Sequence, residues 1–162
     1  MVKWLLILSS LLFFLNSCEK STPLSKYQSS NDLVFIDVVE KKIFKTNSFQ
    51  SIYSDKIEKG LDKWFDNNLK TEGFDGVLEI RLLNLKSEEI AINNSVEIKV
   101  FIEIEFSIFK SVLNGKKIIV ISGDEYGQLN GYFTINDKLT EVDNIIKRLI
   151  EKLSIELTKE LT

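Results

Sequence analysis

The chain contains no histidine, and only one cysteine, one proline and one methionine among its 162 residues. Histidine is the usual general base near neutral pH and a common ligand of zinc and haem, so its absence excludes serine–histidine and cysteine–histidine catalytic pairs. A lone cysteine excludes an intramolecular disulfide. We therefore expect a protein that is not an enzyme and that holds no metal and no cofactor.

Long runs of one charge are also missing. The chain has 21 lysine and arginine residues against 24 aspartate and glutamate residues, for a formal net charge of −3. A mildly acidic chain without a basic patch is a poor partner for nucleic acid, and we expect no such partner. The hydrophobic content of 44% and the length are those of one ordinary folded domain.

The first 17 residues have the pattern of a secretory signal. Lys3 gives a positive start, and residues 4–15 form an apolar stretch that only Ser9 and Ser10 interrupt. As a helix that stretch would extend about 18 Å, which is short of a hydrocarbon core of about 30 Å. Residues 1–17 are therefore predicted to be a cleaved signal peptide rather than a permanent anchor.

The signal ends in Leu15-Asn16-Ser17-Cys18. This segment resembles the bacterial lipobox, in which the cysteine receives a diacylglycerol and becomes the first residue after cleavage. Leu15, Ser17 and Cys18 match that pattern, whereas Asn16 departs from the commoner alanine, serine or threonine. The alternative is an ordinary signal, or an N-terminal anchor helix with an incidental cysteine. The resemblance implies acylation of Cys18, and two or three acyl chains anchor a protein firmly in membrane lipid.

The residues after Cys18 indicate the membrane location of the protein and a tether. Glu19 stands where an aspartate would resemble an inner-membrane retention signal, which favours an outer-membrane lipoprotein facing the periplasm. Residues 19–31 are polar and serine-rich and hold the only proline. A flexible coil of this length reaches about 20 Å. We predict a lipid-anchored flexible tether over residues 18–32 and a single α/β domain over residues 33–162.

Hydrophobic periodicity in the body predicts strands and helices in the order β-α-β-β-β-α. A β-branched run suggests a strand over 33–39, and a helical stripe that includes Gly60 starts after a Ser48 N-cap and ends before Gly73. Seven apolar positions in strict alternation over 96–108 predict a long half-buried strand. Shorter strands are expected around 78–82 and from 116 to about 126, and a last helix of about 24 residues opens near 136.

These elements predict an α+β fold, namely a two-layer sandwich with a four-stranded, mostly antiparallel sheet and two helices on one face. Asn114-Gly115 is the favoured pair for a tight hairpin turn between the last two strands. The glycine-rich segment 123–131 lacks the residues of a phosphate loop or a calcium loop. We interpret it as a bulged strand end with a turn, and a partner-binding loop is the alternative.

Two groups of side chains are candidates for function. Glu103 and Glu105 lie on one strand face, about 7 Å apart, a spacing that paired catalytic carboxylates can have. Because they interleave with other charged residues, we interpret them as the solvated half of the strand. Phe101 and Phe109 fall on that same polar face, and with Tyr126 and Tyr132 they form a candidate partner surface. The alternatives are isolated exposed apolar residues, or a core position for Tyr132.

A lipobox, a short tether and a β-α-β-β-β-α body resemble groups of small Gram-negative envelope lipoproteins. One group is the lipopolysaccharide-assembly lipoprotein of the outer-membrane translocon, and another is the auxiliary lipoproteins of phospholipid-transport systems. The resemblance implies a non-catalytic accessory or scaffold role with an envelope protein as partner, and it carries over no functional residue except Cys18. The alternative function is a module that binds lipid or another amphiphile between helices and sheet.

Overall fold

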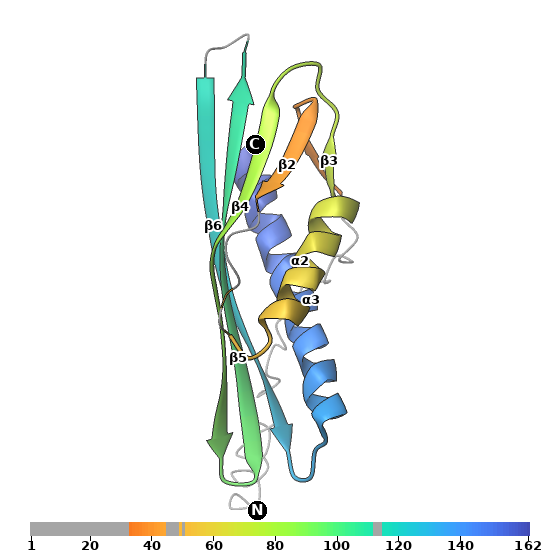
Figure 1. The fold of residues 1–162 in the computed structure, drawn as a ribbon, viewed down its shortest axis with the longest axis vertical. Coiled ribbons are helices and arrows are strands. Elements are labelled where there is room, and N and C mark those ends of the chain that lie inside the picture. The colour runs from red at the N-terminus through yellow and green to blue at the C-terminus, as the bar shows by residue number, and fades with distance from the viewer. Residues whose placement is uncertain (1–32, 45–48, 50, 112–114) are drawn as a thin grey trace, which may run out of the picture.

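A long, twisted sheet with two helices on one side dominates the fold (Figure 1). The computed structural model describes residues 33–44, 49, 51–111 and 115–162. The sheet has the strand order β2-β4-β5-β6, in which β2 is parallel to β4 and the other pairs are antiparallel. The strands of this sheet and the two helices are, in chain order, β2 (Glu40–Phe44), α2 (Ser54–Asn67), β4 (Val77–Ile92), β5 (Ser95–Lys110), β6 (Gly115–Asn130) and α3 (Ile135–Leu161). The predicted α+β sandwich is confirmed, and these six elements follow the predicted β-α-β-β-β-α order.

A second, two-stranded sheet was not predicted. It pairs β1 (Val34–Ile36) in parallel with β3 (Leu69–Thr71). The segment predicted as one strand over 33–39 therefore ends early, because the chain turns where the Val38 N–H donates to the Ile36 carbonyl at 2.8 Å. The strand that joins the main sheet is β2, which follows this turn.

The alternation along β5 decides which side of the sheet is covered. All seven apolar residues of the predicted buried set are buried, from Val96 to Ile108, and they face the helices. At the centre, Phe106 meets Trp64 and Phe65 of α2, with ring centroids 6.4 and 6.5 Å apart in edge-to-face geometry. Such aromatic pairs contribute about 0.5–1.5 kcal/mol beyond the apolar area that they bury.

Glycines allow α2, α3 and the sheet to approach closely. A Cβ at Gly123 of β6 would lie 2.9 Å from Leu149 Cδ1 of α3, and one at Gly60 of α2 would lie 2.7 Å from Ile146 Cγ2. The predicted bulge in segment 123–131 is therefore wrong, because the segment is a regular strand to Asn130 in which Gly123 leaves room for α3. The predicted turn is confirmed after the strand, where Gly131 has a positive φ of 76°.

Helix α2 begins later than predicted, with Tyr53 at its N-cap instead of Ser48. Residue 48 lies outside the described part of the chain. The segment before the helix is bound to the edge of β4, because the Ser87 N–H donates to Ser51 Oγ at 2.7 Å and the Tyr53 N–H donates to Ser87 Oγ at 3.2 Å. These bonds compete with helical ones, so the apolar periodicity there does not become helix.

The end of α2 and the start of α3 each have an identifiable cause. Helix α2 ends at Asn67 rather than near Gly73, because residues 69–71 pair with β1. Helix α3 opens close to the predicted place. Thr134 is its N-cap, and it forms a capping box with Asp137, which accepts from the Thr134 N–H at 2.6 Å.

Two hairpins join the long strands. Ile92 pairs with Ser95, so β4 and β5 are joined by a two-residue turn in which Asn93 has a positive φ of 52°. Asparagine tolerates this left-handed conformation better than most residues. The predicted hairpin between β5 and β6 is confirmed by the pairing of Lys110 with Gly115, although Asn114 itself lies outside the described residues.

The predicted signal peptide, lipobox and tether, including Leu15, Asn16, Ser17 and Cys18, also lie outside the described residues. Within the ranges that the structure describes, neither helix combines the length and apolar character needed to cross a membrane.

Candidate partner-binding face

The face of the sheet turned away from the helices carries most of the candidate surface. Phe101 alternates with buried neighbours on β5 and therefore lies on this open face, between Lys86 of β4 and Asp124 of β6. Tyr126 pairs with Lys99 one row further along, so it is the diagonal neighbour of Phe101. Phe101 is half-buried, whereas the Tyr126 side chain is 62% exposed.

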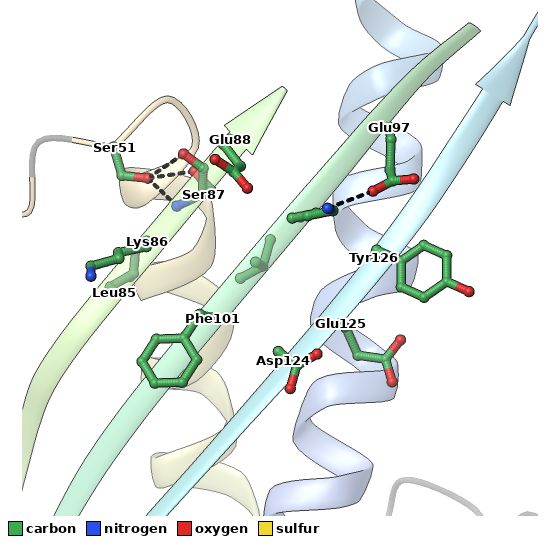
Figure 2. A pocket seen from close by; sticks show the side chains of 12 residues that line it. Ser51, Leu85, Lys86, Ser87, Glu88, Glu97, Phe101, Asp124, Glu125 and Tyr126 are labelled. Atoms are coloured by element: carbon green, nitrogen blue, oxygen red, sulfur yellow. Dashed lines mark hydrogen bonds and ion pairs between the residues drawn. The ribbon is translucent and has the colours of Figure 1, made fainter. Parts of the chain in front are cut away.

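An open groove of about 780 Å³ surrounds this aromatic pair. Figure 2 shows the pair and the charged residues around it on the strands, with the two helices behind them. The charged residues nearest the pair in the sheet register are Lys86, Glu88, Lys99 and Asp124. The groove thus combines an aromatic centre with charges of both signs.

Ion pairs order the charged side chains of the open face. Lys99 Nζ lies 3.0 Å from Glu97 Oε1, and the hydrogen bond to that carboxylate raises the pKa of the Lys99 ammonium. Further along, Arg81 bridges Glu79 at 2.6 Å and Glu105 at 3.2 Å. Glu105 also accepts from Ser107 Oγ at 3.0 Å. Glu105 is therefore engaged in a structural ion-pair network, and its side chain is only 19% exposed rather than freely solvated.

Several exposed apolar residues of the open face were missed in the sequence. Phe44, Ile118 and Val120 are 42–51% exposed. Ile118 and Val120 alternate in β6 with the buried Ile119 and Ile121. An unbroken apolar run of four residues hides this alternation, although strand geometry requires every second side chain to point outward. Leu83 was not missed, because the alternation with Leu82 in the sequence already places it on the open face, where it is 43% exposed.

The structure does not bring all four predicted surface residues together. Phe109 lies on the open face, but it is eight positions from Phe101, or about 26 Å at strand spacing. Its ring packs under Lys116 Nζ, 5.0 Å from the ring centroid. Tyr132 is fully exposed in the turn between β6 and α3, which corrects its alternative interpretation as a core residue. It lies at the far end of the sheet rather than on the open face.

A second polar cluster lies where the loop before α2 meets β4 and α3. Lys138 Nζ is 2.7 Å from Glu89 Oε2, and the Tyr53 hydroxyl donates to the same carboxylate. The hydrogen bond from Lys138, followed by that from Tyr53, lowers the pKa of Glu89. Burial, and then Glu89, raises the pKa of Tyr53. At neutral pH these shifts hold the carboxylate ionised and the phenol protonated, as in a structural anchor rather than a proton-transfer pair.

The described residues contain no group of three or more side chains arranged to hold a metal ion.

Comparison with known proteins gives structural neighbours only. No protein-family model matches the chain, and no curated protein matches it. The fold is similar to a minor lipoprotein from Acinetobacter baumannii, with 13% identity and a TM-score of 0.43 over 80% of this chain and 92% of that one. It is also similar to a protein from Caulobacter crescentus CB15 described as a lipoprotein, with 6% identity and a TM-score of 0.42 over 75% and 85% of the two chains. Both neighbours are thus described as bacterial lipoproteins and neither as the lipopolysaccharide-assembly type, and similarity at this level supports no functional assignment.

Proposed function

We propose that this protein is a membrane-anchored lipoprotein that acts as a non-catalytic accessory or scaffold by binding another envelope protein on the open face of its sheet. The observation that carries the proposal is the Phe101–Tyr126 pair, which lies in a wide groove on the face that the helices leave uncovered. The anchor in the proposal is the lipobox cysteine, Cys18.

The groove has the anatomy of a protein-binding surface. Protein interfaces place aromatic residues at their centre and polar residues at their rim, and tyrosine is enriched among the residues that contribute most binding energy. Around Phe101 and Tyr126 the groove presents charges of both signs. Such a rim favours a partner with a complementary charge pattern over a small apolar ligand.

The alternative of an amphiphile held between helices and sheet receives no support from the packing. The apolar residues at that interface are buried, and both Gly60 and Gly123 stand where a single extra carbon would meet a neighbouring side chain below 3 Å. A ligand there would have to separate α3 from β6. We therefore propose the protein-binding role alone.

Anchoring is tested by the substitution Cys18→Ser. We expect the variant to keep its first 17 residues and to carry no acyl group, because both lipid attachment and cleavage in this pathway require the cysteine thiol. Mass spectrometry of the intact protein measures both properties. Acylation that persists in the variant would contradict the anchor, and density-gradient separation of the wild-type membranes tests the outer-membrane address.

Partner binding is tested by cross-linking and affinity purification of the tagged full chain from its native membrane. We expect one or more envelope proteins to co-purify with the wild type and to be reduced severalfold with Tyr126→Ala. Tyr132→Ala is the matched control, since it removes an exposed tyrosine that lies away from the open face. Equal recovery with both variants, or no envelope protein above background with the wild type, would refute the proposal.

A further inference from the structure

An aromatic side chain projects from one end of the molecule without any covering contact. Phe74 lies in the connection between β3 and β4 and is fully exposed, at 103% of its reference area. Phe35 of the neighbouring β1 is 53% exposed. Figure 1 shows this connection at the end of the molecule where β5 ends and β6 begins, which we call the loop end.

The chain holds this connection in place. The Gly73 N–H donates to the Val38 carbonyl at 2.9 Å, and the Val39 N–H donates to the Gly76 carbonyl at 3.2 Å. Gly76 has a positive φ of 98°, and a Cβ there would clash with the Phe109 carbonyl. Phe74 therefore stands between two fixed points, and its exposure belongs to the fold rather than to a loose loop.

Lysines, the carboxylate of Asp37 and apolar groups lie together at the same loop end. A cavity of about 520 Å³ has Ile36, Ile108 and Leu161 among its apolar lining. Lys110, Lys116 and Lys117 also line it. Lys110 is paired with Asp37, and Lys117 Nζ donates to the Glu160 carbonyl at 2.6 Å. Exposed phenylalanine beside lysine is the chemistry that proteins use against a phospholipid surface, where acyl chains lie beneath phosphate groups.

The position of the tether selects this end over the other one. Fourteen residues lie between Cys18 and Leu33, and the tether predicted there would have a mean reach of about 20 Å as a coil. Val34 pairs with Leu69, which precedes Phe74 by five residues, or at most about 17 Å of chain. The opposite end of the sheet, where Tyr132 lies, is further from Val34. Strand β5 is about 50 Å long for its 16 residues, and much of that length separates Val34 from the opposite end. Contact through that end would require the tether to extend well beyond its mean reach.

We infer that the loop end rests on the lipid surface to which the protein is anchored, with Phe74 inserted among the lipid headgroups. This inference rests on the proposed acylation of Cys18. It orients the body so that the long strands rise from the membrane and the open face is presented sideways to a partner.

The test uses the full acylated chain in vesicles of phosphatidylcholine and phosphatidylglycerol whose acyl chains carry bromine, which quenches nearby tryptophan. Phe74→Trp is compared with Tyr132→Trp, because both positions are fully exposed. The β3–β4 connection and the β6–α3 turn, which hold them, lie at opposite ends of the sheet (Figure 1). Trp64 is 2% exposed and gives the same background in both variants. We expect at least severalfold stronger bromine quenching of the added tryptophan in the Phe74→Trp variant. Equal quenching, or stronger quenching in the Tyr132→Trp variant, would overturn the inference.

Two further measurements separate the possible failures. Mass spectrometry of the same samples reports acylation at Cys18. An acylated chain without selective quenching overturns the inference alone, whereas a chain without acyl groups overturns the proposed anchor and the inference with it. Phe35→Trp provides a second reporter at the loop end, and Lys116→Glu with Lys117→Glu should lower the quenching of the Phe74→Trp variant when phosphatidylglycerol is present.

Discussion

The two faces of strand β5 differ in what covers them, although their residues alternate along one chain. Phe106 points toward the helices and is completely buried, whereas Phe101, five residues away, points to the open face and is half-buried in a groove. On the covered face, the apolar side chains are buried against α2 and α3. The open face keeps aromatic and aliphatic side chains that no described element covers, and it is the face on which we propose that a partner binds.

The largest contrast should come from removing one phenylalanine from each face. Phe106→Ala leaves a cavity beside Trp64 and should lower the free energy of unfolding by about 3–5 kcal/mol. Phe101→Ala opens no enclosed cavity and should cost less than about 1 kcal/mol. Urea unfolding followed by far-UV circular dichroism measures both, and comparable losses would contradict the division of the sheet into a packed face and a free face.

A smaller contrast is expected for neighbouring residues of β6. Gly123→Val places methyl groups against Leu149 and should cost about 1–3 kcal/mol by displacing α3. Ser122→Val changes the next residue along, on the open face, and should stay within about 0.5 kcal/mol. Thermal unfolding of the two variants gives the comparison. A tolerated Gly123→Val would mean that α3 does not approach β6 as closely as the glycine indicates.

The smallest predicted effect is on the stability of the fold at acidic pH. Because Lys138 and then Tyr53 lower the folded-state pKa of Glu89, this carboxylate adds stability above its unfolded pKa and loses it as pH falls through its folded pKa. Its side chain is 22% exposed and bound to a lysine, so we expect a contribution below about 1 kcal/mol. In the Glu89→Gln variant, the free energy of unfolding should fall less steeply as the pH is lowered. Glu103→Gln on the open face serves as the control. An unchanged acid limb in Glu89→Gln would show that the cluster does not stabilise the fold.

The main layers of the fold could be predicted because they depend on periodicity. Strict alternation in β5 and the stripe of α3 each determine an element and its buried face before any contact is known. The helical stripe was predicted to continue through Gly60 despite the cost of glycine in a helix, and the structure explains this glycine by its close approach to Ile146.

The errors arise where contacts distant in sequence decide local structure. The pairing of Ser51 with Ser87 delays α2 by several residues, and the contact of Gly123 with Leu149 makes a regular strand of what looks like a bulge. Likewise β1 and β3 are three residues each and acquire their structure only by pairing with one another. Local patterns carry no information about these partners.

The candidate surface was predicted in part for the same reason. Alternation places Phe101 on the open face, but the position of Tyr126 beside it depends on the register of β6, which only the β5–β6 pairing sets. Tyr132 follows the strand and falls outside the surface. Phe74 carries no periodic pattern at all, so its exposure could be found only in the fold.

The central claim is that the open face is where a partner binds, and site-specific photo-cross-linking in native membranes tests it most directly. Tyr126, on the open face, would be replaced by p-benzoylphenylalanine in one strain, and Ile155, 70% exposed on α3, in another. We predict a discrete adduct with an envelope protein from position 126 and none from position 155. An adduct from position 155 with none from position 126 would contradict the account.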